Sequence, residues 1–276
     1  MPELPEVESA VRRLRKATVG KTIADASVLH PALERRLSNA RLRSVRGATV
    51  ASVERRGKHQ LLRLDDGRVL HAHFRMTGDW TMDRASAPLP RFARAYVAFD
   101  NGARVVLDDP RALSTLDLHA KNDEPDLGLG PEPSDSALTA EYLLGAFAKR
   151  RGPIKPVLLD QRVIAGLGNI YAAEALWHSK ISPLVLAKDL TKKQVSTLIG
   201  AIRKVIKAAT GARYTDADVS ELAVYDREAQ TCRRCGNTIE RVVQAGRSTY
   251  YCPGCQLGAG RRKAADRSAA RRTKER

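Results

Sequence analysis

The sequence predicts an α+β protein, in which an antiparallel β-sandwich or barrel with a leading helix precedes a helical region and a four-cysteine module. Two dipeptides that favour the turns of β-hairpins, Asp66-Gly67 and Asn101-Gly102, lie between strand-like segments of the first half. Beyond residue 136 the apolar residues instead recur at helical spacing. Two pairs of cysteines follow near the end of the chain. Strands first and helices later are typical of the α+β class.

Residues 1–8 read MPELPEVE and predict the start of the leading helix. Pro5 suits the first turn of a helix, and the acidic residues around it suit the positive end of the helix dipole. Apolar side chains then recur at helical spacing from Val7 to Leu14. Gly20 is expected to end this helix.

The same stretch has a chemical interpretation. Removal of Met1 would leave Pro2 with a free secondary amine, and an α-amino group titrates near ~8. Such an amine can attack a sugar or carbonyl carbon and form an iminium, which accepts electrons. Residue types alone leave both interpretations of the octet open.

The other predicted elements fall on either side of one break. The strand-like segments are residues 48–53, 61–64, 69–74, 95–99 and 104–107. Prolines and glycines crowd residues 122–136, and this composition predicts a domain boundary. The helical segments are residues 138–149, 154–161, 170–177 and 192–209, the last closed by Gly211. The basic residues of the last helix either form a solvated face or contact phosphate.

Composition narrows the class of partner. The chain has 276 residues, 43% of them hydrophobic, with a net charge of +17 and a pI near 10.1. This charge indicates a polyanion, either nucleic acid or an anionic membrane. No apolar run approaches the roughly 20 residues of a membrane span, and the start lacks the order of a signal peptide. We therefore expect a cytoplasmic protein that binds DNA or RNA.

The cysteines form the pairs Cys232-x-x-Cys235 and Cys252-x-x-Cys255, separated by sixteen residues. In a reducing compartment this spacing predicts a four-thiolate zinc site. The alternative, two redox-active pairs, lacks the strand and helix of a thioredoxin-like motif. Gly236 and Gly254 suit the tight turns of a zinc ribbon.

Two further stretches each allow two interpretations. Residues 160–174 read DQRVIAGLGNIYAAE and place a glycine-rich turn before a helix, where backbone N–H groups bind phosphate or where Asn169 caps the helix. The spacing is not that of a dinucleotide fingerprint.

The tail, residues 261–276, carries a net charge of +6 and is expected to be disordered. It either raises non-specific DNA affinity or contributes only solubility.

The motifs described above, taken together, resemble those of a known protein family. Six motifs occur in order: PELPEVE at 2–8, RRGK at 55–58, HFRMTG at 73–78, DPR at 109–111, GLGNIYAAE at 166–174, and the four cysteines. Together they resemble the bacterial formamidopyrimidine-DNA glycosylase family from Pro2 to about Cys255. Leu4 favours this branch of the family, because the related endonuclease VIII branch usually has glycine at that position.

The resemblance implies an architecture with DNA between two domains. It implies an N-terminal catalytic β-sandwich at residues 1–130, a helix-two-turns-helix domain at 131–228, a zinc finger at 229–260 and the disordered basic tail at 261–276. The implied partner is damaged double-stranded DNA, and the implied cofactor is one structural zinc ion. No membrane and no nucleotide cofactor are expected, and we expect a monomer associated with the nucleoid.

The resemblance also implies an activity: excision of oxidised bases, followed by β- and δ-elimination at the abasic site. The implied catalytic residues are Pro2, Glu3, Glu6, Lys58 and Glu174. The implied DNA-binding residues are Lys58, Met76, Arg94, Arg111, Leu113, Lys155, Asn169, Tyr171 and Arg247. The implied zinc ligands are Cys232, Cys235, Cys252 and Cys255. For Glu174 an ordinary place on a helix surface is the alternative, and Lys155 is expected near the damaged base.

Three departures from the family pattern bear on the substrate. Leu113 stands where the family usually has phenylalanine, and Asp226 replaces a glycine before the zinc finger. The segment 210–226 lacks the longer, glycine-containing loop that closes over 8-oxoguanine in relatives. We therefore predict weak or absent excision of 8-oxoguanine, with activity retained on formamidopyrimidines, other lesions or abasic sites.

Two other functions fit part of the sequence. A non-catalytic DNA-binding homologue would keep the phosphate contacts and the zinc finger, but it would not need Pro2, Glu3 and Glu6. A zinc-ribbon RNA-binding or ribosome-associated protein fits the charge and the cysteines but leaves the N-terminal octet unexplained.

Overall fold

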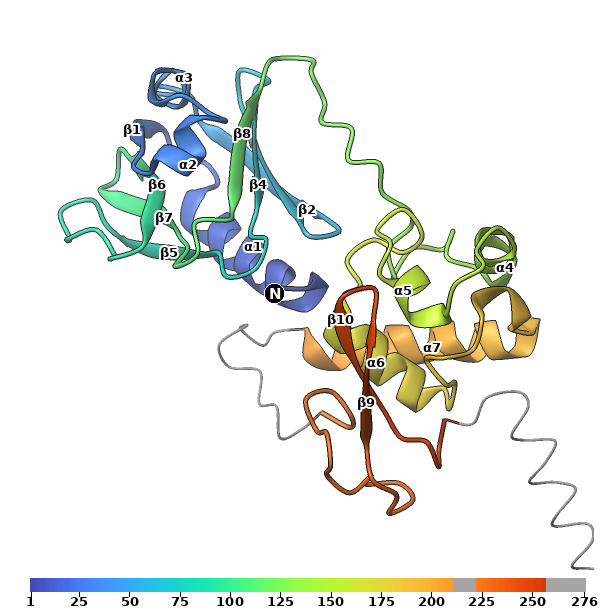
Figure 1. The fold of residues 1–276 in the computed structure, drawn as a ribbon. Coiled ribbons are helices and arrows are strands. Elements are labelled where there is room, and N and C mark those ends of the chain that lie inside the picture. The colour runs from blue at the N-terminus through green and yellow to red at the C-terminus, as the bar shows by residue number, and fades with distance from the viewer. Residues whose placement is uncertain (211–221, 257–276) are drawn as a thin grey trace, which may run out of the picture. The chain divides into compact units, whose positions relative to one another are not determined.

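A computed structural model describes residues 1–210 and 222–256, and the chain divides into two compact units. Among the described residues, unit 1 comprises 1–127 and 209–210, and unit 2 comprises 128–208 and 222–256. Strands dominate the first and helices the second (Figure 1). The predicted α+β class is confirmed.

Unit 1 contains two four-stranded antiparallel sheets. One has the order β1 (Ile23–Val28), β6 (Ala93–Phe99), β7 (Ala103–Asp108), β5 (Asp79–Arg84). The other has the order β2 (Val50–Arg56), β3 (His59–Leu64), β4 (Val69–His73), β8 (Thr115–His119). One buried apolar cluster collects side chains from both sheets, so the predicted sandwich is present. Gly67 and Gly102 have φ of 86° and 76° in the hairpin turns that the sequence predicts.

The leading helix α1 (Leu4–Thr18) covers edge strands of the sandwich, because it contacts β2 of one sheet and β5 of the other. Its apolar side packs into the core, and its arginines fasten it to both strands. Arg15 donates to the Val53 carbonyl at 2.7 Å, and Arg13 pairs with Asp79 at 2.8 Å. Gly20, with φ of 75°, follows the end of the helix as predicted. Two short helices, α2 (Pro31–Glu34) and α3 (Asn39–Arg43), contact β1.

Unit 2 is helical and carries one hairpin. Its elements are α4 (Ala140–Ala148), α5 (Ile154–Leu158), α6 (Asn169–His178), the 3₁₀ turn η1 (Ala187–Asp189), α7 (Lys192–Ala209), β9 (Glu240–Gln244) and β10 (Arg247–Tyr251). The four helices match the predicted segments, although α5 ends three residues earlier than expected. Among the residues that the structure describes, no helix is long and apolar enough to cross a membrane.

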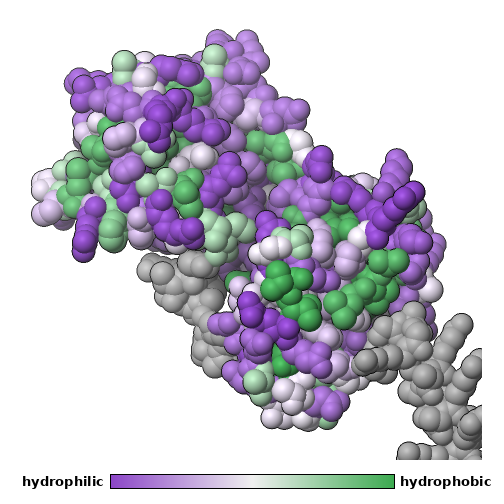
Figure 2. Space-filling model, in the orientation of Figure 1, coloured by the Kyte–Doolittle hydropathy of each residue, from purple (hydrophilic) through white to green (hydrophobic). Residues whose placement is uncertain are grey.

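The surface is mainly hydrophilic in the view of Figure 2, as the high content of charged residues leads one to expect. Large apolar side chains are nevertheless exposed at a few described positions. Met76 and Leu113 in unit 1 are 38% and 42% exposed, and Leu184 and Val243 in unit 2 are 47% and 66% exposed.

Candidate functional site

The start of the chain places ionisable side chains in a buried setting. Pro2 is buried, and Glu3 and Glu6 are only 1% and 4% exposed. The Glu6 carboxylate accepts the backbone N–H of Glu3 at 2.8 Å, as part of a capping box at the start of α1. The capping interpretation of the octet is therefore correct. It does not exclude the chemical interpretation, because Glu3 and Glu6 follow Pro2 by only one and four residues in the sequence.

Lys58 joins this cluster from the turn between β2 and β3 and is 5% exposed. The neighbouring Arg55 fastens that turn to α1, because its guanidinium pairs with Glu8 at 2.7 Å. Burial lowers the pKa of the Met1 amine, Glu3 and Glu6 oppose this change, and the positive charges of Lys58 and Arg111 add to it. An amine in these surroundings is neutral, and hence nucleophilic, over more of the physiological pH range.

Two loops of unit 1 present three of the predicted DNA-binding residues to solvent. Met76 lies in the loop between β4 and β5, and Arg111 and Leu113 lie in the loop between β7 and β8. All three side chains are exposed. Arg94 has another role in the structure: its guanidinium donates to the carbonyls of Asp109 and Pro110 at 2.7 and 3.3 Å and so supports the second loop.

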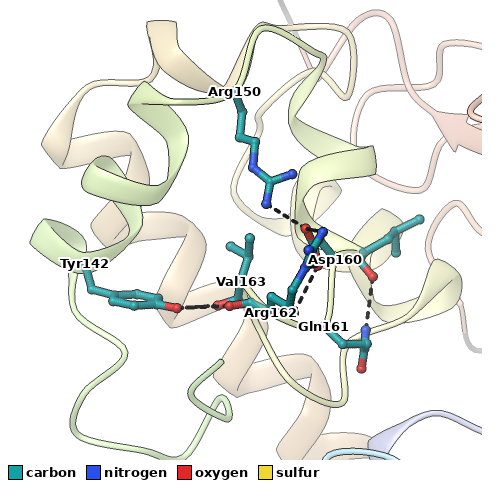
Figure 3. A network of polar contacts seen from close by, with 7 residues as sticks. Tyr142, Arg150, Asp160, Gln161, Arg162 and Val163 are labelled. Atoms are coloured by element: carbon teal, nitrogen blue, oxygen red, sulfur yellow. Dashed lines mark hydrogen bonds and ion pairs between the residues drawn. The ribbon is translucent and has the colours of Figure 1, made fainter. Parts of the chain in front are cut away.

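In unit 2 a polar network fixes the turn between α5 and α6 (Figure 3). Asp160 accepts from Arg150 at 2.7 Å and from Arg162 at 3.1 Å. The hydrogen bond from Arg162 lowers the pKa of Asp160 to about 2, burial opposes this, and Arg150 adds to it. Gln161 donates to the Leu167 carbonyl at 2.8 Å and accepts the Gly166 N–H at 2.9 Å. The Gln161 side chain therefore fixes the backbone of the glycine-rich turn before α6 at Gly166 and Leu167.

Asn169 does not cap α6. The N-cap residue is Gly168, and the Asn169 side chain instead accepts a hydrogen bond from the Lys155 ammonium at 2.6 Å and donates to the Ser248 carbonyl at 3.1 Å. The capping interpretation of this residue is wrong, because its amide bridges two other elements. Lys155 is 1% exposed and also donates to the Ser248 carbonyl at 2.8 Å and the Thr249 hydroxyl at 2.9 Å.

The hairpin of β9 and β10 brings Arg247 next to this bridge. Its two-residue turn has Ala245 at φ 47° and Gly246 at φ 72°, and the exposed Arg247 follows directly. Ser248 and Thr249, which accept from Lys155, are the next two residues of β10. Arg247 and Asn169 are therefore coupled through one buried ammonium. Tyr171, the remaining residue of this predicted set, is 5% exposed on α6.

Glu174 is not a helix-surface acid, because it is only 4% exposed. Its carboxylate accepts the backbone N–H groups of Ala223, Val224 and Tyr225 at 2.8, 2.9 and 2.9 Å. Charged hydrogen bonds of this kind are strong, so Glu174 anchors the chain that leads to the zinc finger. In the described residues its visible role is structural.

The four cysteine sulfurs lie within 4.8 Å of one another. Sγ of Cys232 is 3.8 Å from Sγ of Cys255, and Sγ of Cys235 is 3.4 Å from Sγ of Cys252. Tetrahedral zinc with Zn–S bonds of about 2.3 Å requires sulfur separations of about 3.8 Å, so the site fits one zinc ion. Four thiolates leave no position for a catalytic water, and the zinc is structural.

The two glycines of the zinc finger serve different purposes. Gly236 has φ of 77°, as the tight turn requires. Gly254 is needed for space instead, since a β-carbon there would overlap the Asn237 side chain. The finger packs on α6, because Trp177 and Ala173 share an apolar cluster with Cys232 and Cys252.

Most of the segment 210–226, which the sequence predicts to lack the longer loop, lies outside the described residues, namely 211–221, as does the basic tail. Asp226, which ends that segment, has φ of 57°, a conformation that favours glycine. This explains why glycine is usual at the position, and Asp is among the residues that tolerate it. Its carboxylate accepts the Tyr250 hydroxyl at 3.1 Å.

Residues 1–116 match the family described as the formamidopyrimidine-DNA glycosylase N-terminal domain, residues 129–218 match its H2TH domain, and residues 229–257 match the zinc finger found in FPG and IleRS. The chain belongs to the formamidopyrimidine-DNA glycosylase family. The resemblance stated from the motifs is confirmed, and so are the helix-two-turns-helix domain and the zinc finger.

Curated relatives of the formamidopyrimidine-DNA glycosylase family match along their whole length. The formamidopyrimidine-DNA glycosylase of Paracoccus denitrificans is 39% identical over 280 residues, which cover 93% of this chain and 100% of the relative. That of Desulforamulus reducens is 39% identical over 274 residues, which cover 93% of this chain and 99% of the relative.

Solved structures of the same family agree with the fold. The Lactococcus lactis glycosylase bound non-covalently to DNA with an AP site has a TM-score of 0.84 at 30% identity, covering 92% of this chain and 99% of that one. The same protein in complex with FAPY-dG-containing DNA has a TM-score of 0.85 at 29% identity, covering 92% and 100%.

Sequence reasoning did not assign a role to Asp109, Asp160 or Gln161. Asp109 lies in the DPR motif at 109–111, and Asp160 and Gln161 begin the stretch at 160–174. The partners of Asp109 and Gln161 are mostly backbone groups, which no residue type reveals. Asp160 also pairs with Arg150, ten residues away across a turn.

Proposed function

We propose that this protein is a bifunctional DNA glycosylase that excises oxidised bases from damaged double-stranded DNA and then cleaves the strand at the abasic site. One observation carries the proposal: Glu3, Glu6 and Lys58 are 1%, 4% and 5% exposed near the N-terminal amine. A helix cap accounts for the two carboxylates but needs no buried ammonium. Buried ionisable groups are costly and concentrate at functional sites.

The chemistry starts when processing removes Met1. The Pro2 nitrogen then attacks the C1′ carbon of the damaged nucleotide; a C–N bond forms, the glycosidic bond breaks, and the base leaves with a proton. Glu3 supplies a proton to the sugar ring oxygen or the leaving group, and ring opening gives an iminium. Loss of a C2′ proton expels the 3′ phosphate, a second elimination expels the 5′ phosphate, and water releases Pro2.

The remaining predicted residues would hold the DNA. Lys58, Asn169 and Arg247 carry N–H donors suited to phosphates, and Met76, Arg111 and Leu113 are exposed side chains suited to filling the gap left by an extruded base. The Lactococcus lactis relative was solved with AP-site and with FAPY-dG-containing DNA, which supports damaged DNA as the partner. We further propose that the protein works as a monomer, without a nucleotide cofactor, on chromosomal DNA in the cytoplasm.

The proposed substrate preference follows from Leu113 and the short segment at residues 210–226. We propose efficient excision of formamidopyrimidines and slow excision of 8-oxoguanine. The test is turnover on a panel of single-lesion duplexes that contain a formamidopyrimidine, 8-oxoguanine, an abasic site or no lesion. Cleavage of the formamidopyrimidine and abasic duplexes supports the proposal. Tight binding without cleavage of either supports the non-catalytic homologue, and equal rates on both oxidised purines contradict the preference.

A further inference from the structure

We infer that Asp109 is a positioning residue that joins the loops carrying Met76, Arg111 and Leu113 into one preformed wedge. This inference rests on the proposed function, because it concerns how the gap in the duplex is filled. Asp109 itself cannot touch DNA, since it is 0% exposed.

The hydrogen bonds of its carboxylate reach both loops of unit 1. One oxygen accepts the Thr77 hydroxyl, from the residue after Met76, and the Arg111 N–H at 3.1 Å. The other accepts the N–H groups of Leu113 and Ser114, each at 2.7 Å. Burial opposes ionisation of this group, but these hydrogen bonds outweigh it, and the pKa of Asp109 lies below its ordinary value. An ionised carboxylate therefore ties the two loops together.

The backbone of both loops needs such a tie. Arg75 has φ of 54° and Ala112 has φ of 52°, and each lies next to a wedge residue. Non-glycine residues adopt this conformation only where the surroundings impose it. The loops also meet closely, because a β-carbon on Gly78 would lie 3.1 Å from the β-carbon of Ser114. The two loops leave the paired strands β4 and β8 at one end and β5 and β7 at the other, and the Asp109 carboxylate joins them between these ends.

This role predicts a loss confined to steps that require insertion. An abasic site in a duplex must be turned out and its gap filled, whereas an abasic site in a single-stranded oligonucleotide needs neither. The experiment compares cleavage of both substrates by the full-length protein and its variants Asp109→Asn and Thr77→Val. A duplex with 2-aminopurine opposite the abasic site reports insertion directly through its fluorescence, even where no cleavage occurs.

We expect Asp109→Asn to cleave the duplex roughly tenfold or more slowly, because it weakens several hydrogen bonds to a charged group. Cleavage of the single strand should fall much less, because the loss of Asp109 leaves Glu3, Glu6 and Lys58 in place, and the 2-aminopurine signal should fall. Thr77→Val should show a smaller change in the same direction.

Asp83→Asn is the matched control, because Asp83 pairs with Arg104 at 2.8 Å elsewhere in unit 1. That variant loses stability without a change in the ratio of duplex to single-strand cleavage. Equal losses on both substrates in Asp109→Asn, or the same ratio change in Asp83→Asn, would overturn the inference. If the wild-type protein cleaves neither substrate, the proposed function fails, while the 2-aminopurine signal still decides the role of Asp109.

Discussion

The Lys155 ammonium lies 2.6 Å from the side-chain oxygen of Asn169. A cation cannot accept a hydrogen bond, so this contact fixes the amide with its oxygen toward Lys155 and its NH₂ group toward the hairpin. Asn169 thus presents N–H donors, which a phosphate requires. The same ammonium holds Ser248 and Thr249, beside Arg247. Lys155 therefore orients Asn169 and the hairpin of Arg247, the groups that we propose bind phosphate.

Replacing Lys155 with methionine tests this role. Binding of an abasic-site duplex should weaken by roughly tenfold or more, because buried acceptors lose a charged donor. The dependence of affinity on salt should keep its slope, since an orienting ammonium releases no counterion, whereas Arg247→Gln should reduce the slope by about one. Titrations at several salt concentrations measure both quantities. Lys188→Met, at an exposed lysine of unit 2, is the control. A reduced slope in Lys155→Met would show that this ammonium contacts phosphate itself.

Zinc removal should unfold the zinc finger of unit 2 and so weaken DNA binding. The finger carries the hairpin of Arg247 and packs on α6, so a chelator should release one zinc per chain and weaken DNA binding. Trp177 reports the event, because the Arg234 guanidinium between Cys232 and Cys235 lies 3.6 Å from the centroid of its ring. Its fluorescence should change on zinc release and the change should vanish in Trp177→Phe. Unchanged DNA affinity after complete zinc release would contradict a structural role.

The stability of unit 1 should depend on pH through a row of histidines on β3, β4 and β8. His59 Nδ1 lies 2.8 Å from His71 Nε2, and the rings of His73 and His119 continue the row. Burial, with the charges of His71 and Arg75, lowers the pKa of His59 to about 4. Burial, with the charges of His59, Arg75 and Lys58, lowers the pKa of His73 to about 3.

The unfolded chain binds protons near its ordinary histidine pKa of about 6.5, so the folded state is favoured fully above that pH and less as pH falls toward 4. His59 and His73 should each lower the free energy of unfolding at pH 5 by about 1 to 2 kcal/mol, after discounting for partial exposure. Urea unfolding at pH 7.5 and pH 5 measures this difference. His59→Gln should reduce it, and His30→Gln, outside the row, should not. An identical pH dependence in His59→Gln would contradict the assignment.

Leu113→Phe should restore aromatic stacking on the opposite base. Stacking of a base on an aromatic side chain is worth about 1–3 kcal/mol, of which the present leucine supplies part. We expect severalfold stronger discrimination among the four opposite bases, measured as excision rates in otherwise identical duplexes. Leu89→Phe is a matched control, because both leucines are 42% exposed. The same rates in Leu113→Phe and the wild-type protein would exclude this residue from base recognition.

Local chemistry made much of the fold predictable. The turn dipeptides before Arg68 and Ala103 located two hairpins, and the helical spacing located α4 to α7. The missed strands have weaker patterns. In β1 small alanines take the place of large apolar residues, and in β5 only Trp80 is fully buried. Strand β8 alternates apolar and polar residues, but over only five positions.

The candidate site was less predictable because its groups act through distant partners. The motif marked Glu174, but its three N–H donors come from about fifty residues further along the chain. Lys155 and Ser248 are 93 residues apart. The buried state of Glu3, Glu6 and Lys58 also depends on the packing of α1 against β2, which no local pattern encodes.

Chemical trapping at the N-terminus tests most directly whether Pro2 is the nucleophile. The purified protein is incubated with an abasic-site duplex and sodium borohydride, and the covalent product is digested and its cross-linked peptide sequenced by mass spectrometry. We expect a reduced adduct on the nitrogen of Pro2 in a chain that has lost Met1, and no adduct in a chain that retains Met1. Strand cleavage by a chain with a blocked N-terminus, or an adduct on a lysine side chain, would contradict this expectation.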